Sequence, residues 1–153
     1  CGAAPGARAL RPGRAAGRLA GGNLALLAAL VGTPYAPRSA GAVVVLEDVN
    51  EPVYRVDRML RQLLLSGALD GCRALAFGQC TRCPEPCEDD GRRTLAAVVA
   101  EAAEALGVPA VIGLPVGHVD EQWTLPLGAA CELVAEEGGC GVWVDWGAVA
   151  RVS

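Results

Sequence analysis

A continuous apolar run followed by an amphipathic helix pattern constrains the fold of this chain more than any other feature. The run Ala42–Leu46 is rich in β-branched residues and has no polar alternation, which predicts a strand buried on both faces. A short acidic loop follows it, and then apolar residues recur at helical spacing up to Gly67, at Val56, Met59, Leu60, Leu63 and Leu64. A buried strand joined to such a helix is the unit of a parallel α/β sheet.

Further segments repeat this strand–helix alternation. Strands are predicted over Arg73–Gly78 and Val108–Leu114, and a second long helix over Thr94–Leu106 lies between them. Asn23 is suited to cap a short helix that starts beside it. The sequence therefore predicts an α/β fold.

The two ends of the chain differ from this middle part. Residues 1–20 are rich in Gly, Ala, Pro and Arg without a hydrophobic period, and we expect them to be a linker or the tail of a preceding domain. Residues 21–153 then form the domain. Near its end we expect an antiparallel hairpin, with a strand over Trp123–Val134, broken at Gly128, and a returning strand over Val142–Trp146.

Composition excludes several classes of function. A chain of 153 residues that is 52% hydrophobic and 20% charged can bury its own core, which excludes a disordered chain. The net charge of −4 argues against a nucleic-acid partner. No run approaches the roughly 20 apolar residues that a membrane-spanning helix needs.

Seven cysteines, an odd number, argue against a disulfide scaffold, and we expect reduced thiols in a cytoplasmic protein. Cys80, Cys83 and Cys87 cluster in one acidic loop. They resemble part of a zinc site, but zinc needs four ligands and no histidine lies near them. We therefore expect no metal and no cofactor, and keep a zinc-stabilised, non-catalytic binding module as an alternative.

Two polar residues stand at the ends of predicted buried strands. Glu47 directly follows the first strand, and His118 follows the third after a glycine-containing turn. Ligands bind at the carboxyl ends of strands in open α/β sheets, so the two side chains can meet although they are far apart in the sequence. Such a pair serves as the base and its orienting carboxylate in a catalytic triad.

Simpler interpretations of the same residues remain open. His118 can be a lone surface histidine beside an acidic helix N-terminus. Asp48, Asn50 or Glu51 can cap the helix that begins near Val53.

Four blocks, in order, resemble the C-terminal domain of the LD-carboxypeptidases, serine peptidases related to the microcin-immunity peptidases. The resemblance spans about residues 9 to 146. The blocks are Gly21–Leu27 running on to Gly32–Tyr35, Leu46–Glu51 followed by Tyr54–Leu60, Gly113–His118, and Thr124–Gly128.

The resemblance implies a swivelling β/β/α domain in three layers, joined to an N-terminal α/β domain. It implies that Glu47 is the triad carboxylate and His118 the triad base. The implied reaction releases the terminal D-alanine of a cytosolic muropeptide during peptidoglycan recycling, often by a homodimer. A microcin-immunity-like peptidase is the second hypothesis, which an aromatic residue such as Trp123 stacking on a nucleobase would favour.

The chain departs from that family in its serines. The family places its nucleophilic serine in the N-terminal domain, on a sharp strand–turn–helix elbow. None of the three serines here, Ser39, Ser66 and Ser153, occupies such a turn. We therefore expect this chain to supply Glu and His of the triad and to be inactive alone.

Overall fold

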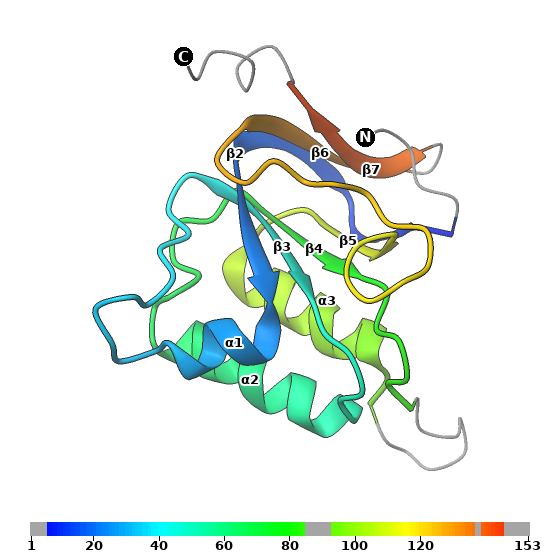
Figure 1. Ribbon diagram of the computed structural model, residues 1–153. Helices are drawn as coiled ribbons and strands as arrows, with labels where there is room; N and C mark the ends of the chain where they lie inside the picture. The colour runs from blue at the N-terminus through cyan, green and yellow to red at the C-terminus, as the bar shows by residue number, and fades with distance from the viewer. Residues whose placement is uncertain (1–5, 85–92, 137–138, 146–153) are drawn as a thin grey trace.

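The structure is a computed structural model and describes residues 6–84, 93–136 and 139–145. Strands and helices alternate through the middle of the described chain, as Figure 1 shows. Their bounds are β1 Arg8–Arg11, β2 Gly13–Asn23, α1 Leu24–Ala29, β3 Ala42–Glu47, α2 Val53–Leu65, β4 Ala74–Gly78, α3 Leu95–Leu106, β5 Ala110–Leu114, β6 Ala130–Glu136 and β7 Gly139–Val144.

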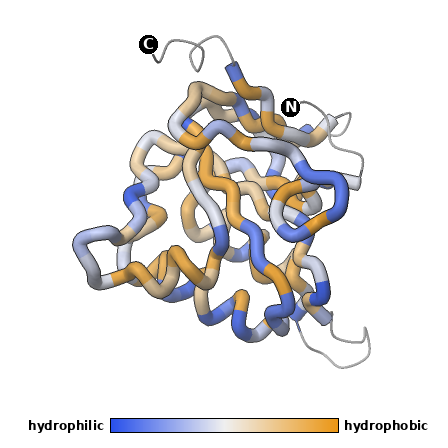
Figure 2. Tube along the Cα trace, viewed as in Figure 1, coloured by the Kyte–Doolittle hydropathy of each residue, from blue (hydrophilic) through white to orange (hydrophobic). Residues whose placement is uncertain are grey.

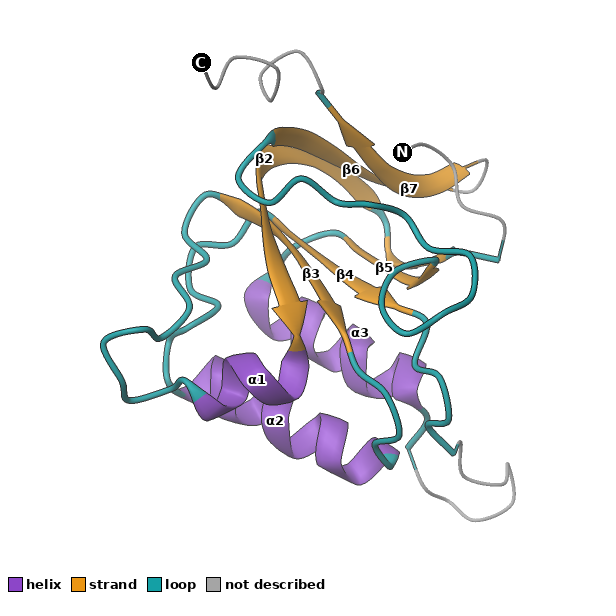
Figure 3. Ribbon diagram, viewed as in Figure 1, coloured by secondary structure: helices purple, strands orange, loops and turns teal. Residues whose placement is uncertain are grey.

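The strands form one seven-stranded sheet in the order β1-β5-β4-β3-β2-β6-β7. The four central strands, β2 to β5, run parallel, while β1, β6 and β7 are antiparallel additions at the two sides. The three helices cover one face of the parallel part (Figure 3). The β6–β7 hairpin lies on the other side, so the molecule has a helix layer and two sheet layers, and the predicted α/β class is confirmed.

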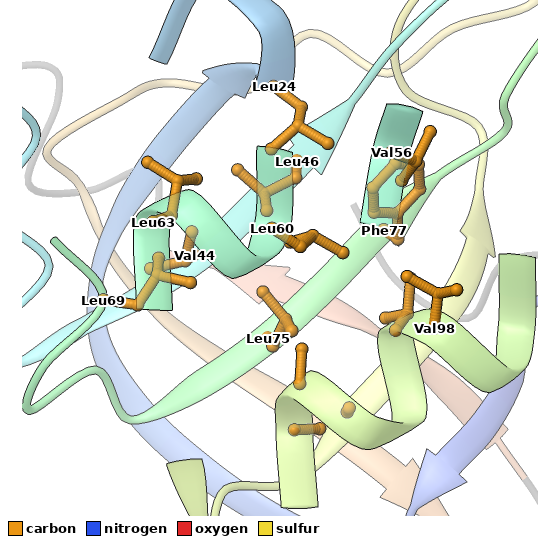
Figure 4. Packing of buried hydrophobic residues seen from close by; sticks show 14 of the residues in the cluster. Leu24, Val44, Leu46, Val56, Leu60, Leu63, Leu69, Leu75, Phe77 and Val98 are labelled. Atoms are coloured by element: carbon orange, nitrogen blue, oxygen red, sulfur yellow. The ribbon is translucent and has the colours of Figure 1, made fainter. Parts of the chain in front are cut away.

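Two hydrophobic cores lie on opposite faces of the parallel strands. The larger packs the helices on the sheet through side chains such as Leu60, Phe77 and Val98 (Figure 4). The smaller fills the space between the sheet layers with Leu19, Leu133 and other apolar residues. Alternate residues of β3 and β4 enter different cores, so both strands are buried along their whole length. Figure 2 shows the two strands as hydrophobic stretches that end in hydrophilic loops.

Local sequence signals set the helix ends. The Asn23 side chain accepts a hydrogen bond from Leu26 N–H at 3.1 Å, so it caps α1 as predicted. Thr94 caps α3 in the same way through Ala97 N–H, and Gly107 ends that helix in a left-handed conformation. The longest of these helices, α2, has 13 residues, and no helix in the described part of the chain is long and apolar enough to cross a bilayer.

The expectation that residues 1–20 are a linker is wrong for the part that the structure describes. Arg8–Arg11 forms β1, and Gly13–Asn23 forms the long strand β2. The first half of β2 pairs with β6 and the second half with β3, so it joins the hairpin to the parallel strands. Its Gly, Ala and Arg residues have low strand propensity, and pairing on both sides outweighs that propensity.

The hairpin begins later than predicted. Residues 123–129 form a loop, and the strand β6 starts only at Ala130. The returning strand β7 ends at Val144, and Trp146 lies outside the described residues. The loop contains Pro126, which has no N–H to contribute to a sheet ladder, and this explains why the apolar residues before it do not extend the strand.

An ion-pair network joins the outer faces of α2 and α3. Asp57 accepts from Arg61 Nε at 2.9 Å, and Arg93 pairs with both Asp57 and Glu101. Burial by itself favours the neutral acid, but Arg93 and then Arg61 outweigh it, so the pKa of Asp57 lies below its ordinary value of 3.8. A lowered carboxyl pKa stabilises the fold above that value, and the stabilisation is lost as the pH falls.

We predict that Asp57→Asn lowers the free energy of unfolding by about 0.5–1 kcal/mol at pH 7 in low salt. The difference should shrink between roughly pH 5 and pH 3, as the wild-type carboxylate becomes protonated. Urea titrations at several pH values measure it, with the exposed Glu104→Gln on α3 as the control. An equal loss of unfolding free energy in both variants would show that the ion-pair network adds nothing beyond the effect of removing any one negative charge.

Candidate active site

The parallel strands bring three chain segments to one edge of the sheet. Glu47 is the last residue of β3, Gly78 ends the neighbouring β4, and β5 on the far side of β4 ends at Leu114. The registers align these ends, with Leu46 beside Phe77 and Phe77 beside Ile112. The loop after β5, yellow to orange in Figure 1, curls back over this edge and carries His118.

His118 and Glu47 meet at this edge, as the sequence predicts. His118 Nδ1 lies 3.0 Å from Glu47 Oε2. A carboxylate only accepts hydrogen bonds, so the proton of the neutral imidazole resides on Nδ1 and the lone pair on Nε2. The imidazole is 58% exposed whereas the Glu47 side chain is 11% exposed, so a largely buried carboxylate holds a largely exposed ring. The interpretation of His118 as a lone surface histidine is therefore wrong.

Two glycines let the backbone close around Glu47. Gly117 has φ of +104°, and a Cβ placed on it would lie 2.5 Å from Glu47 Oε2. A Cβ on Gly78 would collide with the backbone oxygen of Val116 and lie 3.2 Å from Glu47 Cβ. Both positions therefore need glycine, and the sequence pattern before His118 reflects this close packing rather than loop flexibility alone.

Asp48 has a role that the sequence analysis did not assign. Its side chain is buried and accepts hydrogen bonds from Ala25 N–H at 3.0 Å and from the Asn23 amide at 3.3 Å. It therefore caps α1. By contrast, α2 begins at Val53 after the N-cap residue Pro52 and has no side-chain cap, contrary to the expected capping by Asp48, Asn50 or Glu51. Because Asn23 pairs with Glu47 in the ladder, this cluster holds the ends of β2 and β3 together.

A hollow of about 550 Å³ lies against the loop that carries His118. The loop that follows His118 forms most of its wall, and Gln79 at the end of β4 completes it. Trp123 contributes to this wall and also packs against the smaller core. The lining residues are Gln79, Pro115, Val119, Asp120, Glu121, Gln122 and Trp123.

The predicted cysteine cluster does not present thiolates. Cys80 and Cys83 form a disulfide, and Cys87 lies outside the described residues. The expectation of reduced thiols is therefore wrong for this pair, although Cys72, Cys131 and Cys140 are free and buried. Among the described residues, no three His, Cys, Asp or Glu side chains converge to hold a metal ion. Disulfide sulfurs lack the negative charge by which cysteine binds zinc, so the structure gives the zinc-stabilised module no support.

The described serines lie away from the His118–Glu47 pair. Ser39 precedes β3, and Ser66 follows α2 on the way to the start of β4. Both stand at the amino-terminal edge of the parallel strands, whereas Glu47 stands at the carboxyl edge. The six residues of β3 separate the two edges by roughly 20 Å, far beyond hydrogen-bond reach.

The fold and the site together define a class of protein: a three-layer α/β domain with a histidine–carboxylate pair at its strand ends. In hydrolases, such a pair activates the nucleophile. The chain matches the family described as the LD-carboxypeptidase C-terminal domain over residues 16–133. It belongs to that family.

Relatives agree with this assignment. A putative carboxypeptidase from Streptomyces coelicolor is 45% identical over 134 residues, which are 87% of this chain and 41% of that protein. The murein tetrapeptide carboxypeptidase of Pseudomonas aeruginosa is 39% identical over 123 residues, covering 78% of this chain and 38% of its own. The chain thus spans about two fifths of the length of these relatives.

A solved structure supports the fold. The crystal structure of the muramoyltetrapeptide carboxypeptidase from Oxalobacter formigenes superposes with a TM-score of 0.77 at 36% identity. The match covers 88% of this chain and 46% of that one. The swivelling β/β/α domain implied by the sequence resemblance is confirmed at the level of fold.

The single histidine makes the Glu47 contact directly measurable. We predict that Glu47→Ala moves the proton of neutral His118 from Nδ1 toward Nε2, because the acceptor that fixes the tautomer is gone. Ring ¹⁵N chemical shifts at alkaline pH report the tautomer without overlap, since the chain has one histidine. Unchanged shifts would contradict the hydrogen bond.

We predict that Gly117→Ala destabilises the fold by about 1–3 kcal/mol more than Gly128→Ala. Both glycines have positive φ, but a Cβ on Gly128 meets nothing within 4 Å, whereas one on Gly117 strikes Glu47. Urea unfolding of both variants separates the clash from the backbone strain they share. Equal losses would mean that Gly117 is needed only for its φ.

Proposed function

We propose that this chain supplies the base and the orienting carboxylate of a serine-type LD-carboxypeptidase that releases the terminal D-alanine from a murein tetrapeptide. The observation that carries the proposal is the bond between His118 Nδ1 and Glu47 Oε2, made by a domain of the LD-carboxypeptidase family. The names of the Pseudomonas and Oxalobacter relatives support the substrate class.

The proposed reaction starts with His118 as the base. Its Nε2 takes the proton of a serine hydroxyl while the serine oxygen attacks the carbonyl carbon of the scissile amide. Glu47 stabilises the imidazolium that forms. The imidazolium then gives its proton to the amine of the departing D-alanine as the C–N bond breaks. Water hydrolyses the remaining acyl-enzyme, with His118 acting again as base and then as acid.

The serine is proposed to come from a preceding α/β domain of the whole protein. Ser39 and Ser66 stand at the wrong edge of the sheet, and Ser153 lies outside the described residues. The relatives exceed the matched region by more than half of their length, which is room for such a domain. The largely exposed imidazole of His118 is suited to receive a nucleophile from another domain.

The hollow against the His118 loop is proposed to receive part of the peptide. It is lined by residues on both sides of His118 in the same loop and by Gln79, and its volume of about 550 Å³ falls within the range of small-molecule sites. Trp123 in its wall keeps the microcin-immunity-like hypothesis open, because an aromatic face can stack on a nucleobase. Competition between a murein tetrapeptide and a peptidyl nucleotide in the whole protein decides between the two substrates.

Further proposals concern the whole protein. From the family resemblance we propose that it is a cytoplasmic homodimer, acting on muropeptides taken up for recycling. Light scattering coupled to size exclusion tests the dimer.

We predict that the isolated chain does not release D-alanine from a tetrapeptide. In the whole protein, His118→Ala and Glu47→Ala should each lower kcat by about 10³-fold or more, because each removes a member of the triad. Ser66→Ala serves as the control, since that hydroxyl hydrogen-bonds within its own helix end. D-alanine released per unit time is the measurement. Release by the isolated chain at the rate of the whole protein would overturn the proposal, and so would full activity of His118→Ala.

A further inference from the structure

The Cys80–Cys83 disulfide occupies a central position at the candidate active site. It follows directly after β4, the strand that lies between β3 with Glu47 and β5 with the His118 loop. Gln79, the residue before it, lines the hollow against the His118 loop and donates its backbone N–H to Leu114 O at 2.9 Å. The disulfide closes a ring of residues from Cys80 to Cys83, and this ring is therefore attached to the segment that leads to His118.

The same ring is attached to the loop that follows Glu47. Thr81, inside the ring, forms an isolated parallel bridge with Val49, and its carbonyl accepts the N–H of Asn50 at 2.9 Å. Val49 is two residues from Glu47. A change in the backbone of the ring therefore reaches the loop after β3 through one hydrogen-bonded contact.

The backbone of these two loops is in an unusual conformation. Among the described residues, the non-glycine residues with positive φ are Asn50, at 59°, and Arg82, at 57°. Asparagine tolerates this left-handed region, but arginine adopts it uncommonly. The disulfide spans Arg82, so reducing it frees that residue to return to an ordinary conformation.

The two disulfide sulfurs are more reachable than the free thiols. Cys80 and Cys83 are half-buried, and Arg82 between them in sequence is exposed. Cys72, Cys131 and Cys140 are buried, and burial raises the pKa of Cys131 to about 11. A reagent in solution therefore distinguishes the pair from the other described cysteines.

The disulfide is not what holds the fold together. It closes a ring between residues only three apart in sequence, and so short a loop restricts the unfolded chain little. Most of the sheet and all three helices are fixed instead by the two hydrophobic cores. The bond therefore contributes little to the stability of the fold, yet the ring that it closes is connected to both sides of the site.

We propose that Cys80 and Cys83 form a reversible thiol–disulfide exchange site whose substrate is a dithiol, and that the disulfide form holds the loop after β3, at Val49 and Asn50, in place. A thiolate of the dithiol attacks one sulfur, the Cys80–Cys83 bond breaks, and a mixed disulfide forms. The second thiol of the reductant attacks that mixed disulfide. The protein gains two thiols and two electrons, and the reductant becomes a disulfide.

The first experiment tests the exchange itself on this chain. Native protein is equilibrated with mixtures of reduced and oxidised dithiothreitol, alkylated, and mapped by mass spectrometry. Cys80 and Cys83 should become alkylated together and reversibly, while Cys72, Cys131 and Cys140 stay protected. Labelling of the pair only after the protein unfolds would overturn the proposal, as would a disulfide from either cysteine to Cys87.

The second experiment tests the coupling without measuring hydrolysis. Reduction, or the double variant Cys80→Ser/Cys83→Ser, should speed hydrogen exchange of the Asn50 amide about tenfold and leave the Gly41 amide unchanged. Gly41 N–H bonds to Gly71 O at the opposite edge of the sheet and serves as the internal control. Equal exchange at Asn50 in both redox forms would contradict the coupling.

A lower rate of D-alanine release from the reduced whole protein is also expected, and only this effect rests on the proposed function. If exchange at Asn50 responds to reduction but no D-alanine is released in either form, then the proposed function fails and the redox site stands. If D-alanine is released equally in both forms while Asn50 does not respond, then the redox coupling fails alone.

Discussion

Parallel pairing of β3, β4 and β5 is the constraint on which the site depends. Because these strands run in one direction and are aligned in register, their carboxyl ends stop at the same edge. Glu47 ends the first, and the loop with His118 follows the third, which allows a hydrogen bond between residues 71 positions apart. The two hydrophobic cores keep the sheet in that arrangement, so burial far from the edge contributes to the geometry of the polar pair.

Burial of one partner and exposure of the other gives the pair its chemical character. Gly78 and Gly117 allow backbone to pack against Glu47, and the capped turn at Asn23 and Asp48 fixes the neighbouring strand end. The Glu47 carboxylate therefore has little conformational freedom, and its hydrogen bond fixes the orientation of the His118 imidazole. The imidazole itself remains largely exposed. Backbone hydrogen bonds of Thr81, inside the Cys80–Cys83 ring, and of Gln79, just before it, connect this ring to the two segments that hold the pair.

Sequence patterns correctly predicted those parts of the fold in which the local sequence alone indicates whether a residue is buried or ends a helix. The apolar run that became β3, the helical spacing of α2 and the cap at Asn23 are local signals with one dominant physical meaning. These local patterns failed to predict strands whose formation depends on hydrogen bonds to neighbouring strands. Strand β2 contains small and charged residues that favour no strand, and it exists because β3 and β6 supply hydrogen bonds on its two sides.

For the site, the sequence alone determined which residues are available: one histidine after a strand, an acidic residue after another, and no serine on an elbow turn. Strand ends restrict where such residues can lie, and this made the Glu47–His118 pair predictable. Only the tertiary structure decided that Asp48 caps α1, that Gly117 packs on Glu47, and that Cys80 pairs with Cys83. The first two are contacts between distant segments, whose geometry depends on how the whole chain packs. The third is a choice of partner among nearby cysteines that the sequence spacing left open.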